Sequence, residues 1–374
     1  MDKLKDKKVL LLTTTDNMIW QFLIPHARFM QEHGATVECA CAKTGFWFDE
    51  LAKMGFVMHE IPFTRSPFSI KNLKGYKQLK KIVKENDINL IHCHQPVGGA
   101  MGRFAAKKFK IPCIYTAHGF HFFKGAPLKN RIIFKTIEKY CSKFTTALVT
   151  MNNEDFENAS KMKAKKAYQI NGIGLDLKKY KKTEDFDKAT FRAELGVQKD
   201  EFVIVTVAEF IKRKNYATML ETIKELGDKN IKFLICGRGQ QEQEIKNIIE
   251  RDNLQEKVTI LGYRKDVDKI LQISDCFFLP SFQEGLTLSI IEAMTFGLPV
   301  ITSTARGNRD LITDGVNGFV AEPKDYKTFA KKISILMDDK NLQKEMSKAN
   351  KKDCQNYDIS IVIEQMKKVY EESL

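Results

Sequence analysis

Two glutamates eight positions apart, Glu284 and Glu292, lie in the segment of this sequence that is most typical of a binding site. A predicted strand ends shortly before Glu284, and a predicted helix starts near position 286 and contains Glu292. The first amides of such a helix point outward and favour a phosphate group; here they belong to Gly285, Leu286 and Thr287. A carboxylate accepts hydrogen bonds through both oxygens, so Glu284 could hold sugar hydroxyls and Glu292 a ribose diol. Two solvated glutamates on a surface helix are the alternative, which the spacing alone favours.

The cations that a phosphate needs occur in a second segment, VAEFIKRKN at 207–215. It follows a predicted strand and precedes a predicted helix, which places its side chains at the edge of a sheet. Lys214 could approach a diphosphate as a point charge, and Arg213 could bind it through two hydrogen bonds. A lysine-rich loop in solvent is the alternative.

Histidines end two other predicted strands. His118 closes the run IYTAH, and Gly119 after it allows a close approach to the backbone. A lone histidine at a strand end is more often structural than catalytic, and His121 is its local rival. His92 and His94 share one face of a strand and could supply two metal ligands, but no third ligand is evident in the sequence.

The elements that position these residues form two series. Short apolar runs alternate with longer amphipathic segments from 8 to 150 and again from 202 to 302, which predicts βαβ units and parallel sheets. The first amphipathic segment predicts one helix at 18–32. The predicted strands are 8–13, 36–42, 57–61, 88–93, 113–117 and 145–150 in the first series, and 202–208, 231–236, 258–261, 276–279 and 300–302 in the second. The fold class is therefore α/β, with two doubly wound, Rossmann-like domains that face each other across a cleft at the carboxyl ends of both sheets. We expect an N-terminal domain at 1–180, a C-terminal domain at 188–353, and a helix at 354–374 that packs back on the first domain. The segment 171–187 lacks a clear period and is the predicted linker.

Length and composition agree with this organisation. The chain has 374 residues and a mass of 43.0 kDa, enough for two or three domains with their own cores. No apolar run reaches the roughly 18 residues of a membrane span, and the basic, then apolar start is interpreted as a strand and not as a signal peptide. Eight cysteines spread thinly over this length argue against a disulfide scaffold.

Charge separates the two halves. Residues 1–185 contain 32 Lys and Arg against 17 Asp and Glu, a net +15, whereas 29 and 30 in residues 186–374 give −1. A basic first half favours an anionic partner, and solubility is the alternative. The segment 61–84 and the aromatic residues Trp20 and Phe22 suit a membrane interface, although an amphipathic helix packed on its own sheet explains them equally well. Nucleic-acid binding would rest on charge alone and is not expected.

Four segments together resemble a known family. EGLTLSIIEAMTFGLP, with Glu284 and Glu292, resembles the E-x7-E segment of retaining glycosyltransferases of the two-Rossmann-domain (GT-B) type, family 4. The segments 91–103, 114–125 and 306–312 look like the branch that builds bacterial exopolysaccharide and capsule. The resemblance covers nearly the whole chain, and the E-x7-E spacing without the other segments would not be specific.

The resemblance assigns site residues. It implies catalytic roles for His118, Lys214 and Glu284. On the donor side it implies Arg213, Gly237, Tyr263, Arg264, Gly285, Leu286, Thr287, Glu292, Arg306, Gly307 and Asn308, and on the acceptor side His94, Gly98, Gly99 and His121. Arg264 could stack on the nucleoside base. The family commonly has an arginine where this chain has Glu209, so Lys212, Arg213 or Arg306 is expected to supply that charge.

The implied reaction is the transfer of a hexose or N-acetylhexosamine, with retention, from a nucleotide-sugar (UDP-linked is expected) to a polyprenyl-diphosphate-linked or glycan acceptor. No metal or other cofactor is expected, because this transferase type needs no metal for its diphosphate. The implied place is the cytoplasm, peripheral on the inner face of the plasma membrane. A UDP-sugar 2-epimerase-like isomerase and a non-catalytic nucleotide-sugar sensor remain the alternatives.

Overall fold

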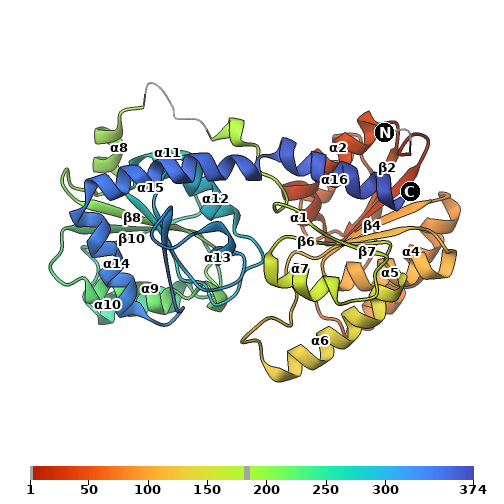
Figure 1. Cartoon of the computed structure of the whole chain (residues 1–374), viewed down its shortest axis with the longest axis horizontal. Helices are drawn as coiled ribbons and strands as arrows, with labels where there is room; N and C mark the ends of the chain where they lie inside the picture. Colours follow the sequence, from red (N-terminus) through yellow and green to blue (C-terminus); the bar gives the residue numbers. More distant parts are fainter. Residues whose placement is uncertain (1–2, 181–185) are drawn as a thin grey trace. The chain divides into compact units, whose positions relative to one another are not determined.

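The structure is a computed structural model that describes residues 3–180 and 186–374, so residues 181–185 of the predicted linker lie outside the described residues. The chain divides into two compact units (Figure 1). Unit 1 comprises Met1–Gly174 and Ile359–Leu374, and unit 2 comprises Leu175–Asp358. In the described part of the chain, no helix has the length and apolar character needed to span a bilayer.

Unit 1 is built on a seven-stranded parallel sheet in the order β3-β2-β1-β4-β5-β6-β7. Its strands are β1 (Lys8–Thr15), β2 (Thr36–Ala42), β3 (Val57–Glu60), β4 (Leu90–His94), β5 (Cys113–Thr116), β6 (Ala147–Thr150) and β7 (Lys166–Gln169). The first six coincide with predicted strands to within a few residues. The edge strand β7 was missed because its sequence, KAYQ, has no buried residue and therefore no apolar run.

Helices cover both faces of this sheet. On one face α4 (Lys71–Glu85), α5 (Pro96–Phe109) and α6 (Leu128–Cys141) lie side by side, and α2 (Ile24–Glu32) and α16 (Ile359–Ser373) pack together on the other (Figure 1). The remaining helices of two turns or more are α3 (Trp47–Lys53) and α7 (Asn153–Ser160). The predicted single helix at 18–32 is interrupted: a short α1 (Asp16–Met18) leads into a π-helical turn, Ile19–Leu23, before α2 begins.

Unit 2 has a six-stranded parallel sheet in the order β10-β9-β8-β11-β12-β13. The strands are β8 (Phe202–Val207), β9 (Ile231–Cys236), β10 (Val258–Gly262), β11 (Cys276–Leu279), β12 (Val300–Ser303) and β13 (Gly318–Ala321). Its longer helices are α8 (Lys188–Glu194), α9 (Tyr216–Glu225), α10 (Glu242–Arg251), α11 (Val267–Ile273), α12 (Leu288–Thr295), α14 (Tyr326–Asp338) and α15 (Lys340–Asp353), with a single turn α13 (Asn308–Leu311).

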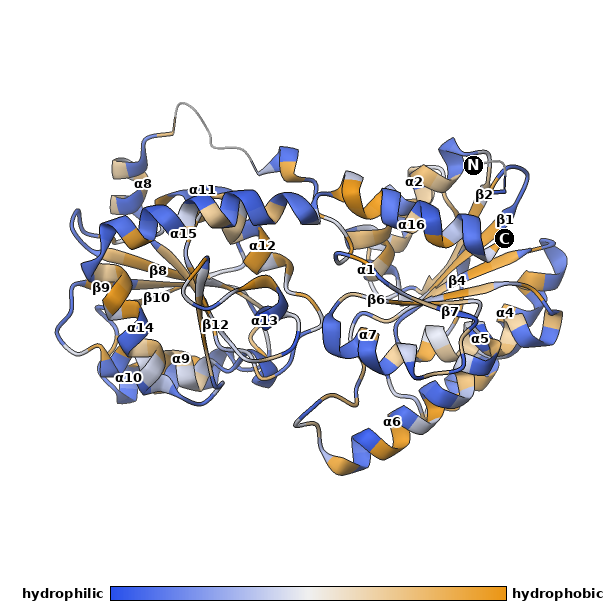
Figure 2. Ribbon diagram, in the orientation of Figure 1, coloured by the Kyte–Doolittle hydropathy of each residue, from blue (hydrophilic) through white to orange (hydrophobic). Residues whose placement is uncertain are grey.

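Each unit has its own apolar core, which Figure 2 shows as hydrophobic strands beneath helices that are hydrophilic on their outer side. The central strands β1, β4, β8 and β11 are buried along almost their whole length. Burial on both faces is what continuous apolar strands predict for a parallel sheet. The expectation of two doubly wound α/β domains is therefore confirmed.

Candidate active site

A buried carboxylate with two cations lies at the carboxyl edge of the unit 2 sheet. Lys214 Nζ donates to Glu284 Oε1 at 2.6 Å, and Arg213 donates from a terminal nitrogen to Oε2 at 2.8 Å. Lys214 and Glu284 are buried, whereas Arg213 remains partly exposed. Both oxygens of Glu284 thus carry a charged hydrogen bond, which is the strong form of such a contact.

The order of the strands brings these residues together across 70 positions of sequence. Lys214 follows β8 and Glu284 follows β11, and these two strands are neighbours in the sheet. Asn215 fixes the turn between Lys214 and α9: it adopts a left-handed backbone conformation with φ of 63°, and its side-chain amide donates to the carbonyls of Pro280 and Pro323. Asparagine tolerates this conformation better than most residues do.

A third loop, after β12, closes around the same carboxylate residue. Arg306 is buried and donates from Nε to the Glu284 carbonyl at 3.2 Å. Gly307 has a φ of +80°, and a Cβ there would lie 2.2 Å from the carbonyl oxygen of Gly285, so only glycine fits. The Asn308 side chain accepts a 2.6 Å hydrogen bond from the Thr287 hydroxyl.

Helix α12 begins at Leu288 with Thr287 as its N-cap, slightly later than predicted. The amides of Gly285, Leu286 and Thr287 therefore belong to the loop before the helix and to its cap. The backbone N–H groups of Leu286 and Thr287 have no acceptor among residues 3–180 and 186–374. This loop can still offer amides to an anion, beside the cations on Glu284.

Electrostatics keep Glu284 ionised. Burial alone would raise the pKa of Glu284, but Lys214 and Arg213 together hold that pKa below its usual value. Burial lowers the pKa of Lys214, against the attraction of Glu284. Glu209, at the position of the family's usual arginine, is exposed, as is Lys212. The cations that contact Glu284 are therefore Lys214, Arg213 and Arg306.

Glu292 lies inside α12 and contacts a residue that the sequence did not indicate. Tyr180 donates from its hydroxyl to Glu292 Oε1 at 2.8 Å. Burial raises the pKa of Glu292, and this hydrogen bond opposes the rise. Tyr180 follows a short 3₁₀ turn, Leu177–Lys179, in the segment predicted as a linker, so no local pattern linked it to α12.

The remaining donor-side candidates follow β9 and β10. The Gly237 amide donates to the Gly262 carbonyl, which joins the ends of these two strands. The Arg264 guanidinium forms two hydrogen bonds with Asp266, at 2.8 and 2.7 Å, and its stacking on a base stays a prediction. Arg238 lies over the exposed ring of Tyr263, 4.9 Å from its centroid. Arg238, in the segment CGRG at 236–239, was not among the predicted site residues.

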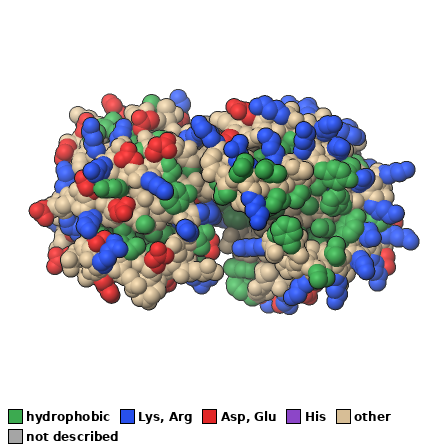
Figure 3. All heavy atoms as spheres, turned by 90° about the horizontal axis from the view of Figure 1, so that it is seen from below, with side chains coloured by type: hydrophobic (Ala, Val, Ile, Leu, Met, Phe, Trp, Pro, Cys, Tyr) green, Lys and Arg blue, Asp and Glu red, His purple; other side chains and the backbone are tan. Residues whose placement is uncertain are grey.

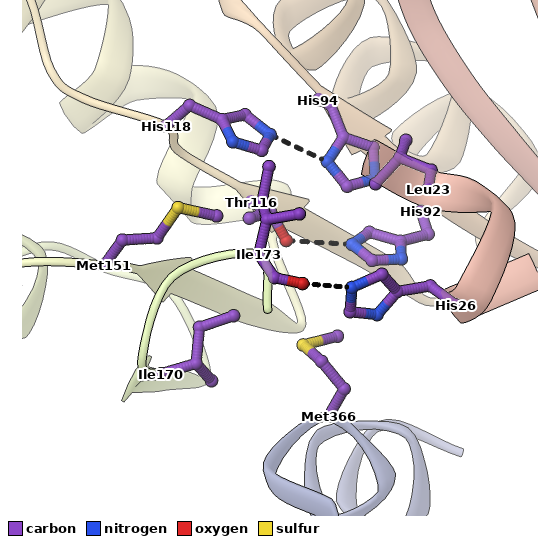
Figure 4. Close-up of a pocket in the computed structure, with 10 residues that line it drawn as sticks. All are labelled: Leu23, His26, His92, His94, Thr116, His118, Met151, Ile170, Ile173 and Met366. Carbon is purple, nitrogen blue, oxygen red and sulfur yellow. Dashed lines mark hydrogen bonds between the residues drawn. The ribbon is translucent and has the colours of Figure 1, made fainter. Parts of the chain in front are cut away.

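Unit 1 gathers histidines at the carboxyl edge of its own sheet, around a small pocket (Figure 4). His94 Nδ1 and His118 Nε2 are 3.1 Å apart, within hydrogen-bonding distance. His92 binds the Thr116 hydroxyl through Nε2 and the Tyr370 hydroxyl of α16 through Nδ1. His26 completes the group through the Ile173 carbonyl. We call His26, His92, His94 and His118 the histidine cluster.

The histidine cluster is neutral at physiological pH. Burial, followed by the nearby His26, lowers the pKa of His118 to about 3. Burial likewise lowers the pKa values of His92 and His94 well below the usual value. These rings can therefore exchange hydrogen bonds but do not carry charge. Over the described part of the chain, no three His, Cys, Asp or Glu side chains are grouped so as to hold a metal ion.

The other acceptor-side candidates lie near the cluster in sequence but have packing contacts. Gly98 and Gly99 are buried in the first turn of α5. A Cβ on Gly99 would lie 2.3 Å from the Tyr115 ring, so this glycine lets α5 approach the sheet. His121 packs on Phe134 of α6, with ring centroids 4.8 Å apart. These contacts explain the three residues by packing and leave their acceptor roles as predictions.

Comparisons with known proteins agree with the two-unit architecture. The family model described as "Glycosyl transferase 4-like" matches residues 8–153, and the one described as "Glycosyl transferases group 1" matches 187–353. The cyanobacterial protein HepE of Anabaena, solved with UDP, superposes with a TM-score of 0.82 at 19% identity and covers 98% of this chain and 99% of its own.

Curated relatives cover most of the chain. EpsD of Bacillus subtilis, named as a glycosyltransferase, is 30% identical over 97% of this chain and 96% of its own. The Escherichia coli UDP-Gal:alpha-D-GlcNAc-diphosphoundecaprenol alpha-1,3-galactosyltransferase is 31% identical over 80% of each chain. The capsular polysaccharide biosynthesis glycosyltransferase CapM of Staphylococcus aureus is 24% identical over 84% of each. The chain therefore belongs to the GT-B glycosyltransferases whose two halves are the family 4-like and group 1 domains, and it is a transferase.

Proposed function

We propose that this glycosyltransferase moves a hexose or N-acetylhexosamine, with retention, from a UDP-sugar to a saccharide on a polyprenyl diphosphate, during cell-surface polysaccharide synthesis. The observation that carries the proposal is the pairing of Glu284 with Lys214 and Arg213 beside the loop at 285–287. This arrangement combines hydrogen-bond acceptors for a sugar with cations and amides for a diphosphate.

The donor assignment has two supports. Arg213 and Lys214 pair with the Glu284 carboxylate, and Arg306 donates to the Glu284 backbone carbonyl, so three cations lie together at the sheet edge. The Escherichia coli relative uses a UDP-sugar, and HepE was solved with UDP. We assign the ribose to Glu292 and the base to the side of the sheet that carries Gly237, Tyr263 and Arg238.

Catalysis in this proposal rests on stabilising the leaving diphosphate. Lys214, Arg213 and the loop amides would take up its growing negative charge, a type of contribution that is commonly the largest in enzymes. Glu284 is a poor nucleophile while both of its oxygens are held by cations. We therefore propose retention without a covalent enzyme intermediate, with the leaving phosphate accepting the acceptor proton.

His118 is proposed to bind hydroxyl groups of the sugars rather than to transfer a proton as an acid. Its depressed pKa leaves the ring neutral, so it can donate or accept a hydrogen bond without charge. We propose no metal, because cationic side chains already occupy the position in which a metal would neutralise phosphate charge.

The acceptor proposal rests on relatives. The Escherichia coli enzyme acts on an undecaprenol diphosphate, and CapM is named for capsule synthesis. Such an acceptor is embedded in a membrane, so we propose that the protein works in the cytoplasm, bound peripherally to the inner face of the plasma membrane.

A thermal-shift panel of UDP-, GDP- and ADP-sugars tests the donor, followed by an assay of sugar transfer to a synthetic polyprenyl-diphosphate-linked N-acetylhexosamine. We expect stabilisation by UDP-sugars alone and a product with the same anomeric configuration as the donor. Release of a free epimerised sugar in the absence of acceptor would instead indicate an isomerase. Stabilisation by a UDP-sugar with no turnover on any acceptor would indicate a sensor.

A further inference from the structure

One face of unit 1 exposes apolar side chains near the starts of two of its helices, α4 and α6. Phe68 and Ile70, just before α4, are 81% and 82% exposed, and Leu128 and Ile132 of α6 are 68% and 59% exposed. Soluble proteins commonly expose single apolar residues but rarely expose them in groups. Helix α5 contacts both α4 and α6, so these residues belong to one layer of three helices. We call this layer the α4–α6 face.

The α4–α6 face is almost free of acidic residues. Segment 61–84 contains seven Lys and Arg and no Asp or Glu, and Glu85, the last residue of α4, lies 3.8 Å from Lys81. Segment 88–153 contains ten Lys and Arg and a single acid, Glu138, which is buried and paired with the buried Arg103 at 2.7 Å. Figure 3 shows the result on the side of unit 1 that it presents: hydrophobic side chains gathered among Lys and Arg, with few acidic ones.

A lysine-lined hollow adjoins this face, where α5 and α6 end. Its volume is about 360 Å³, and its lining includes Lys107, Lys110, Lys143 and Lys165. Phe144 forms its apolar wall, with Lys107 Nζ 4.1 Å from the ring centroid. No ion pair joins these four lysines to an acid among residues 3–180 and 186–374. Cations gathered without a counter-ion repel one another, and an anion in the hollow would relieve that repulsion.

Apolar side chains surrounded by cations match the surface of an anionic bilayer. The free energy falls when apolar side chains enter the boundary between headgroups and acyl chains, and each nearby Lys or Arg adds attraction to anionic lipid. A second copy of this chain is a poorer match, because two such basic faces would repel each other.

We propose that the α4–α6 face docks on an anionic phospholipid bilayer, with Leu128, Ile132, Phe68 and Ile70 inserted and the lysine-lined hollow holding lipid phosphate groups. This inference deepens the proposed function and rests on it, since a lipid-linked acceptor must be met at a membrane. It differs from the sequence-based expectation in its elements: α6 and the hollow are added, and Trp20 and Phe22 are omitted because both are half-buried in the π-helical turn.

Vesicle co-sedimentation of the full chain tests the docking. We expect binding to phosphatidylcholine vesicles that contain about 30% phosphatidylglycerol, weakened by salt, and little binding to pure phosphatidylcholine. Leu128→Ser with Ile132→Ser should lower the partition coefficient at least tenfold, by removing apolar side chains from the interface. Lys107→Glu, Lys143→Glu and Lys165→Glu together should lower it roughly 100-fold.

Matched controls come from unit 2. Val316→Ser removes a side chain that is 54% exposed, and Lys344→Glu, Lys348→Glu and Lys352→Glu together reverse three exposed charges on α15. These controls should retain vesicle binding. Equal losses of vesicle binding in the controls and the face variants would show that binding depends only on the overall charge of the protein, and would overturn the proposal.

Three other results would also overturn it. These are an absence of wild-type binding to the anionic vesicles at low salt, a wild-type dimer that Leu128→Ser with Ile132→Ser dissociates, and binding of soluble glycerol phosphate in the hollow without vesicle binding. Turnover on a short-chain, water-soluble acceptor separates this proposal from the proposed function. The face variants should keep that turnover; vesicle binding without any turnover would count against the function alone.

Discussion

The two units bury their ionisable groups in opposite ways. In unit 2 a buried carboxylate stays charged because Lys214 and Arg213 pair with it, and its pKa is held low. In unit 1 burial lowers the pKa of His92, so its ring is uncharged, and its partners Thr116 and Tyr370 are neutral as well. A site of paired charges suits a diphosphate, whereas a neutral cluster of donors and acceptors suits hydroxyl groups. The contrast thus separates the two halves of the proposed reaction.

Lys214→Ala should have the largest effect, because it disrupts the paired charges that distinguish unit 2 from unit 1. It removes the buried cation of unit 2 and leaves Glu284 with Arg213 alone. We expect kcat to fall about 10²- to 10³-fold, the size seen when one preorganised donor to a developing charge is lost. Stability should fall by about 3 kcal/mol, because a buried charge loses its partner. Steady-state kinetics and urea unfolding measure the two effects.

Lys212→Ala is the matched control for that change, since Lys212 is exposed in the same turn. It should leave both kcat and stability nearly unchanged. A comparable loss of kcat in Lys212→Ala would mean that the loop acts through its overall charge and not through the Lys214–Glu284 pair.

Glu292→Ala tests whether the second glutamate of unit 2 binds the nucleotide. We expect UDP to bind about 10- to 100-fold more weakly, because two charge-assisted hydrogen bonds to a ribose diol are lost. Isothermal titration calorimetry with UDP measures the change. Unaltered UDP affinity would refute the ribose assignment.

Tyr180→Phe is a smaller change at the same site and removes only the hydroxyl that contacts Glu292 Oε1. Burial without this hydrogen bond should raise the pKa of Glu292 further. The Glu292 carboxylate of the variant would then take up a proton at a higher pH than that of the wild type. As pH is lowered, UDP binding to the variant should therefore weaken earlier than UDP binding to the wild type. Matching pH profiles for Tyr180→Phe and the wild type would show that Tyr180 does not tune this carboxylate.

The pH dependence of stability tests the neutral cluster of unit 1. A histidine whose folded pKa is depressed binds its proton more readily in the unfolded chain, so stability is full above about pH 6.5 and falls as pH decreases from there toward the folded value. Each such histidine should contribute a slope of about 1.4 kcal/mol per pH unit within this window. His118, whose pKa lies at about 3, should do so down to that pH.

Urea unfolding at several pH values, compared between the wild type and His118→Gln, measures this slope. The variant's free energy of unfolding should fall less steeply with decreasing pH, by about 1.4 kcal/mol per pH unit, because one histidine no longer contributes. Imidazole signals of His92, His94 and His118 should not titrate between pH 8 and 5 in NMR spectra. Titration of these signals near pH 6.5 would contradict a neutral, buried cluster and remove the contrast with unit 2.

The smallest expected effect concerns which arginine of unit 2 contacts the nucleoside base. Arg238→Ala should weaken UDP binding about threefold, because a partly exposed cation over an aromatic ring contributes modestly. Arg264→Ala should weaken UDP binding less than Arg238→Ala does, since Asp266 takes up the hydrogen-bonding edge of Arg264. The opposite ranking in a UDP titration would restore the base-stacking role expected for Arg264.

Local patterns predicted most elements and missed those with weak patterns. The strands β1, β8 and β11 are continuous apolar runs, and their burial on both faces makes such runs visible in the sequence. The edge strand β7 was missed because it has no buried residue, and β13 was missed because its apolar run, FVA, is only three residues long. The π-helical turn at Ile19–Leu23 was also invisible, because it differs from an α-helix by only one hydrogen-bond register.

The sequence by itself determined the two α/β domains, the family, and the types of residue at the sheet edges, since periodicity and short motifs are local properties of the chain. Only the tertiary structure decided which of these residues meet. Strand order brings Lys214 to Glu284, α16 brings Tyr370 to His92 from 278 positions away, and Asp266 holds the guanidinium of Arg264. Such contacts depend on how distant elements pack, and burial at those contacts, not residue type, sets which groups keep their charge.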